Sequence, residues 1–154
     1  MSAGDVDRAG EKHERALAAL RALGDLWGMG IVLFDLALLR VVQHRYVDAR
    51  ALCAEGIALG RQFGDRRAIA WCLGILAGAD AADGHLLRAA RLRGAMEGLL
   101  DGIGSFAQPT YQAWIGDRLF PAVQQELGTD TYRQALAAGR MMSLAQAARY
   151  AIEE

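Results

Sequence analysis

The residue types that most often carry chemistry are few in this sequence and stand far apart. Its three histidines are His13, His44 and His85, and its two cysteines are Cys53 and Cys72. No histidine has a second ligand residue at metal-binding spacing on the same predicted helix. We therefore expect structural or surface roles for the histidines. We expect the cysteines to be small core residues in a reducing compartment.

Nucleophile and phosphate motifs are also missing from the sequence. Ser105 and Ser143 stand in a glycine loop and at a helix start, without the strand–turn–helix pattern of a nucleophile elbow. The glycines follow no predicted strand, and no Gly-x-x-x-x-Gly-Lys-Ser/Thr motif occurs. They are better explained as helix stops and close helix contacts. The sequence predicts a protein that is not an enzyme and uses no cofactor or metal.

Arginine supplies nearly all of the positive charge. The pair Arg66–Arg67 and the row formed by Arg88, Arg91 and Arg93 could bind an acidic partner, although such arginines more often form a solvated face. The net charge of −1 gives no electrostatic reason to expect direct binding to nucleic acid or to an anionic membrane. The most apolar window, 26–42, is too short and too charged to span a bilayer. We expect a cytoplasmic protein.

The elements that must position these residues repeat with a period of 40 residues. Aligning Gly24–Asp25 with Gly64–Asp65 also brings Gly104 into register, together with the apolar residue before each glycine. Those three apolar residues are Leu23, Phe63 and Ile103. The other matched pairs in this register are Leu33 and Leu73; Leu36 and Leu76; Ala37 and Ala77; Ala49 and Ala89; Leu52 and Leu92; Leu59 and Leu99. A fixed period of this length is typical of stacked helical repeats, whose units cannot bury their apolar faces alone.

The pattern predicts an all-α fold, because no stretch alternates with period two for long enough to form a strand. Residues 105–110, which include Pro109, are predicted to form a loop, and Thr110 can cap the helix that follows. Thr129 caps a short helix, and Ser143 with Gln146 forms a capping box. The predicted helices are 5–23, 26–43, 46–63, 66–82, 86–100, 111–120, either a kinked continuation or a new helix from Pro121 to 127, one from Thr129 to Gly139, and 144–152. We expect helical repeats over 1–104, made of a half repeat at 5–23 and repeats at 26–63 and 66–103, and capping helices over 105–154.

The paired helices resemble tetratricopeptide repeats of the long, MalT-like kind. The family pattern of a leucine and a small residue on the first helix, with an alanine on the second, is met by Leu36–Ala37 with Ala49, and by Leu76–Ala77 with Ala89. HEAT-like repeats have a similar period and remain an alternative. The resemblance implies an α-solenoid of helical hairpins that acts in protein–protein interaction.

The C-terminal run resembles the tail that closes many large LuxR-type and related signal-transduction ATPase regulators. The residues that carry this resemblance are Leu127–Gly128, Tyr132, Ala135, Gly139–Arg140, Leu144 and Ala147. It implies the C-terminal part of a bacterial transcriptional regulator, without the nucleotide-binding or DNA-binding parts.

In tetratricopeptide arrays the first helix of each pair lines the concave surface. The residues that would lie there form a predicted binding strip beside a glycine-lined hollow: Ile31, Phe34, Asp35, Leu38, Val41, Trp71, Gly74 and Gly78. Exposed apolar surface of this extent needs a cover. We expect one of three covers: the C-terminal helices with Trp114 and Phe120, a second copy in a homodimer, or a ligand or partner segment.

Three functions follow from these covers. The leading hypothesis is a protein-interaction and sensing module whose strip recognises a partner segment or an apolar effector. The alternatives are a small-molecule inducer sensor and a homo-oligomeric assembly adaptor. An inducer pocket should bring polar groups such as Asp35, Asp80 or Tyr111 beside the strip, whereas a peptide groove should stay open. We expect Phe34→Asp to abolish binding and to leave the helical content intact; unfolding would mean that the strip is internal core.

Overall fold

The computed structural model describes residues 2–153, and every regular element in this range is helical. This confirms the predicted all-α class. The elements are α1 (Ala3–Leu23), α2 (Leu26–Val42), α3 (Tyr46–Phe63), α4 (Arg66–Ala82), α5 (Leu86–Asp101), α6 (Pro109–Tyr111), the π-helical turn η1 (Gln112–Gly116), α7 (Asp117–Leu127), α8 (Thr129–Arg140) and α9 (Leu144–Glu153). None of the helices that the structure describes is long and apolar enough to cross a membrane.

The repeated Gly–Asp dipeptides set the helix boundaries. Gly24 and Gly64 adopt left-handed backbone conformations, with φ of 67° and 66°, and so end α1 and α3. The next residues, Asp25 and Asp65, accept hydrogen bonds from the N–H groups of Gly28 and Ala68, each at 3.0 Å. Each dipeptide therefore stops one helix and caps the next.

Some helix starts differ from the prediction. Ser2 caps α1 in a capping box with Asp5, so α1 begins before Asp5 rather than after it. Pro109 begins α6 at its favoured first helical position, which puts Thr110 inside the helix. Thr129 is likewise inside α8, because Gly128 is at the N-cap.

At α9 the predicted capping box is present. The Ser143 N–H donates to Gln146 Oε1 at 2.9 Å, and the Gln146 N–H donates to Ser143 Oγ at 3.1 Å. Each residue thus satisfies a backbone donor of the other, which fixes the start of the last helix.

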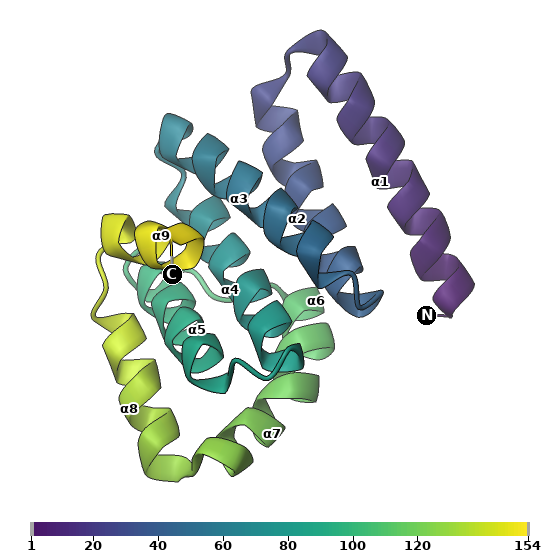
Figure 1. Ribbon diagram of the computed structural model, residues 1–154. Coiled ribbons are helices and arrows are strands. Elements are labelled where there is room, and N and C mark those ends of the chain that lie inside the picture. Colours follow the sequence, from purple (N-terminus) through teal and green to yellow (C-terminus); the bar gives the residue numbers. More distant parts are fainter. Residues whose placement is uncertain (1, 154) are drawn as a thin grey trace.

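Helices α1 to α5 pack in chain order, each against the next, and α2 also contacts α4 (Figure 1). Helix α4 is the centre of the molecule, since its residues from Ile69 to Asp80 are buried except for Trp71. Beyond α5 the chain turns back, so that α7 and α9 contact both α4 and α5, and α8 runs beside α5 (Figure 1). The last third of the chain therefore covers the second helical pair.

Glycines allow the backbones of α8 and α5 to come into direct contact. A Cβ added at Gly98 would lie 2.8 Å from the Arg140 carbonyl oxygen, and one at Gly139 would lie 2.8 Å from the Ala95 nitrogen. Contacts this short leave no room for a side chain. The Gly139–Arg140 step noted in the sequence is therefore a helix-packing feature of this fold.

Candidate functional site

An open cavity of about 710 Å³ lies where α2, the end of α3, the start of α4 and the turn after α5 meet. We call it the aromatic groove. Its large apolar lining residues are Trp27, Ile31, Phe34, Phe63, Trp71 and Ile103. Its charged and polar lining residues are Asp35, Asp65, Arg66, Arg67 and Gln108.

Helix geometry and ring contacts organise the groove. Trp27, Ile31 and Phe34 lie one turn apart along a single stripe of α2, because residues separated by three or four positions share a helix face. Trp27 meets Phe63 edge to face at a centroid distance of 6.2 Å. Phe34 packs on Trp71 at 5.3 Å with a tilt of 45°. Both geometries are favourable for aromatic pairs, so these rings hold the groove in shape.

The groove leaves a large amount of apolar surface in water. Trp27 is 62% exposed, Ile31 58%, Phe63 47% and Ile103 37%. Among the described residues ten large apolar side chains are exposed, and these four line one groove. Single exposed apolar residues are ordinary, but a cluster around one concavity marks an interaction surface.

The charged residues at the groove differ in whether they have partners within the chain. Arg66 and Arg67 are exposed in the first turn of α4, and within residues 2–153 neither guanidinium has a carboxylate within ion-pair distance. The Asp65 carboxylate is engaged as the cap of α4. On α2 the Asp35 carboxylate lies 3.6 Å from Nε2 of His13. The two arginines therefore lack an ion-pair partner within residues 2–153, and Asp35 has one only when the His13 imidazole is protonated.

The structure divides the predicted binding strip. Ile31, Phe34, Asp35 and Trp71 line the aromatic groove. Leu38 and Val41, together with most of the Phe34 ring, are instead buried in the main hydrophobic core. The strip is thus open only along the first half of α2.

The predicted hollow at Gly74 and Gly78 is filled, which corrects the idea of an inducer pocket there. A Cβ added at Gly74 would lie 3.0 Å from Cε2 of Tyr111, and one at Gly78 would lie 2.7 Å from Cγ2 of Ile115. Burial raises the pKa of Tyr111, so this phenol stays neutral under the C-terminal segment. The cover is formed by the C-terminal segment, as one of the three expectations had it, but it touches these glycines through Tyr111 and Ile115.

The groove contains residues outside the predicted strip. Trp27, Phe63 and Ile103 belong to it, together with the two arginines of α4. A signal for two of them was present in the repeat, because Phe63 and Ile103 are the apolar residues before the periodic glycines Gly64 and Gly104. The 40-residue register equates their positions but does not show that both reach one cavity.

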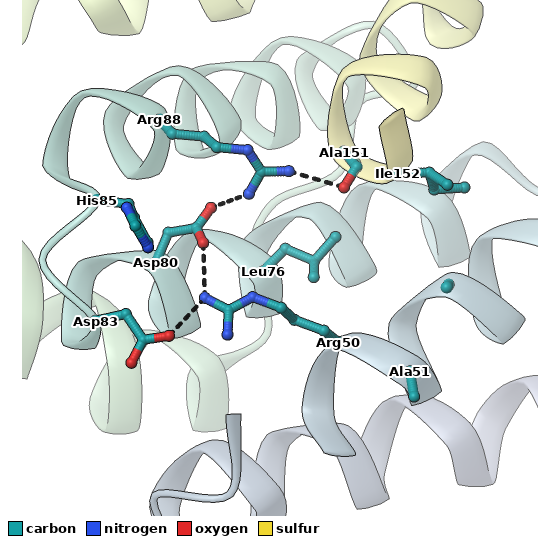
Figure 2. Close-up of a pocket in the computed structure, with 10 residues that line it drawn as sticks. Arg50, Ala51, Leu76, Asp80, Asp83, His85, Arg88, Ala151 and Ile152 are labelled. Atoms are coloured by element: carbon teal, nitrogen blue, oxygen red, sulfur yellow. Dashed lines mark hydrogen bonds and ion pairs between the residues drawn. The ribbon is translucent and has the colours of Figure 1, made fainter. Parts of the chain in front are cut away.

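A second cavity, of about 520 Å³, is charged and lies under the end of α9 (Figure 2). Asp80, only 2% exposed, accepts hydrogen bonds from Arg50 at 2.9 Å and from Arg88. Arg50 also pairs with Asp83 at 2.8 Å, and Arg88 donates to the Ala151 carbonyl oxygen at 2.8 Å. This network connects α3, α4, α5 and the last turn of α9. The charged residues of this cavity therefore serve to hold helices together.

The cysteines lie in the core as predicted. Cys53 and Cys72 are free thiols and are both buried. Burial, together with a hydrogen bond from the Cys53 thiol to Cys72, raises the pKa of Cys53, so Cys53 remains protonated and a poor nucleophile. Within the part of the chain that the structure describes, no three histidine, cysteine or acidic residues come together as a metal-binding group.

Neither a family model, nor a curated protein, nor a solved structure gives a significant match to this chain.

The two cavities differ in whether their charged residues already have partners within the chain. In the charged cavity Arg50, Asp80, Asp83 and Arg88 all have partners. The aromatic groove combines unpaired arginines with exposed aromatic rings, and it is the candidate functional site.

Proposed function

We propose that the chain is a non-catalytic, tetratricopeptide-like module that binds a segment of a partner protein in the aromatic groove. The observation that carries this proposal is the gathering of four exposed, large apolar side chains around one concavity. Covering a tryptophan or isoleucine side chain contributes about 1.5–3 kcal/mol relative to leaving it in water. A partner that covered both Trp27 and Ile31 would gain part of the free energy that a specific complex needs.

The repeat architecture in this proposal is supported by the helix bounds. Helices α2 and α4 begin at Leu26 and Arg66, and α3 and α5 begin at Tyr46 and Leu86, so both offsets equal 40 residues. The resemblance of the C-terminal run to LuxR-type regulators supports a role in signal sensing within a bacterial transcriptional regulator.

A peptide fits the groove better than a small inducer. Pockets for small molecules bury most of the ligand and bring polar groups together, whereas Trp27 and Ile31 leave this groove wide open. Of the three polar groups expected beside an inducer pocket, Asp35 does line the groove, whereas Asp80 belongs to the charged cavity and Tyr111 is buried over Gly74. An open apolar stripe on a helix is the surface that receives an amphipathic partner helix.

The test is selection from a displayed library of helical peptides on the complete 154-residue chain. We expect enrichment of peptides with large apolar residues at i, i+3 or i+4, and i+7. Trp27→Ala should weaken their binding by about 30-fold, because a central tryptophan contributes about 2 kcal/mol to an interface.

Variants of exposed residues keep this test independent of folding. Phe34→Asp would put a carboxylate into the core, since Phe34 is 4% exposed, so Ile31→Ala replaces it as the second groove variant. Val47→Ala is the matched control, because Val47 is 80% exposed on α3 and outside the groove. Selected peptides that bind both groove variants as tightly as the native chain would refute the proposal, as would a selection without enrichment.

A further inference from the structure

We infer that the partner segment is acidic: an amphipathic helix whose apolar side chains enter the aromatic groove and whose carboxylates pair with Arg66 and Arg67. This inference rests on the proposed function and specifies the chemistry of the occupant. It commits to a peptide with aspartate or glutamate beside its apolar stripe.

The positions of the two arginines point to an anion. The N-terminal end of a helix carries partial positive charge, so cations in the first turn are disfavoured and carboxylates are favoured. Helix α4 has both Arg66 and Arg67 in its first turn and no acidic residue there. Within residues 2–153 the Asp65 cap is the carboxylate that offsets this repulsion, and an external carboxylate would offset it further.

Some arginines elsewhere in the described part of the chain pair with acids, whereas others, such as Arg118 and Arg133, are exposed without an ion pair. Arg21 donates to Glu55 at 2.6 Å across two helices, and Arg45 pairs with Asp48 at 2.8 Å. Arg66 and Arg67 line the groove but have no such partner within residues 2–153. Their guanidinium groups thus remain available at the site where four apolar side chains are exposed.

The arginines lie beside the apolar lining of the groove, and this position favours a partner with negative charge next to its apolar residues. Arg66 reaches towards the turn that carries Ile103, because its Nη2 lies 3.8 Å from the place of a Cβ on Gly102. Arg67 lies next to it and lines the same groove. A helix whose apolar stripe covers Trp27 and Ile103 would therefore present its flank to the arginines, and glutamate on that flank would be attracted where lysine would be repelled.

The experiment uses a helical peptide library in which each polar position holds glutamate, glutamine or lysine with equal frequency. Selected peptides should be enriched in glutamate on one flank of the apolar stripe. Their affinity should fall as salt is added, because partly exposed ion pairs are screened. Enrichment of glutamine or lysine on both flanks would overturn the inference of an acidic partner.

Paired variants separate the arginines from the groove itself. Arg66→Gln/Arg67→Gln should weaken the binding of the selected peptides by about five- to tenfold, in line with the loss of one exposed ion pair at each arginine. Arg118→Gln/Arg133→Gln removes the same charge from exposed positions elsewhere and should leave affinity unchanged. If both double variants bind like the native chain while Trp27→Ala does not, the inference fails and the proposed function stands. If Trp27→Ala also binds normally, the proposed function fails.

Discussion

Helices α2 and α4, and likewise α3 and α5, begin 40 residues apart, yet α2–α3, the open pair, borders an open groove and α4–α5, the closed pair, is covered by the C-terminal segment. Phe34 and Leu38 of α2 correspond to Gly74 and Gly78 of α4. On α2 these positions are filled by the helix's own side chains, and the groove beside them stays open. On α4 the missing side chains leave room for the C-terminal segment. At these two matched positions α2 thus fills the space with its own side chains, whereas α4 leaves it to a distant segment of the chain.

The same offset relates two buried charges. Arg40 on α2 and Asp80 on α4 are 4% and 2% exposed. Arg40 bonds to Glu14 of α1, whereas Asp80 holds Arg88, which in turn binds the end of α9. The matched positions 40 and 80 thus both help to attach a neighbouring helix. Arg40 binds α1 with a positive charge, and Asp80 holds α9 through Arg88 with a negative one.

The largest effect is expected at the buried acid of the closed pair. Asp80→Ala should lower the free energy of unfolding by about 3–5 kcal/mol, because Arg88 and Arg50 would be left without their shared carboxylate. Urea unfolding followed by circular dichroism measures the loss. Asp35→Ala, which removes a half-exposed carboxylate on α2, is the control and should change little. Equal losses for the two variants would remove the distinction between the pairs.

Exchanging a residue between the pairs should break the closed one. Gly78→Leu introduces the side chain that α2 carries at the matching position, into space occupied by Ile115. We expect a loss of about 3 kcal/mol from overpacking and easier proteolysis between α5 and α7. Limited proteolysis with mass spectrometry locates the cleavage. A variant as resistant as the native chain would show that the C-terminal segment does not depend on this glycine.

A glycine of the open pair should respond in the other direction. Gly30 lies in α2 beside the groove, and a Cβ added there would meet nothing within 4 Å. Gly30→Ala should therefore raise the free energy of unfolding by about 0.5–1 kcal/mol through better helix propensity. Thermal unfolding shows the gain as a higher midpoint. A destabilised variant would mean that the open pair is packed as tightly there as the closed one.

The smallest effect on stability is expected in the groove itself. Trp27→Ala and Ile31→Ala should change the free energy of unfolding by no more than about 0.5 kcal/mol, because both side chains are mostly exposed. Leu73→Ala, at a fully buried position of α4, should cost about 2–5 kcal/mol in the same measurement. Groove variants that approached the Leu73→Ala loss would identify the groove as core.

Local signals in the sequence were sufficient for most of the fold. Gly24–Asp25 and Gly64–Asp65 each combine a left-handed stop with a cap, so the ends of α1 and α3 and the starts of α2 and α4 follow from the residues at those boundaries. The π-helical turn Gln112–Gly116 has no such local mark and was not predicted. It belongs to the segment whose conformation depends on packing against α4.

The site could be predicted only in part, because what covers a surface is a non-local property. Ile31 and Trp71 were recognised from the helical period. Gly74 and Gly78 were interpreted as a hollow because they lack side chains, whereas Tyr111 and Ile115 occupy that space from more than 30 positions away along the chain. The helical period shows which residues share a face of a helix but does not say which distant segment meets them.

The exposed indole of Trp27 gives the groove its own optical reporter. An indole in water emits at longer wavelength than one in an apolar environment, and Trp71 and Trp114 are already half-buried. A segment that covered Trp27 would shift the protein's fluorescence to shorter wavelength, and the edge contact with Phe63 would hold the ring in place for energy transfer to a labelled partner. Occupancy of the groove can therefore be followed without attaching a dye to this chain.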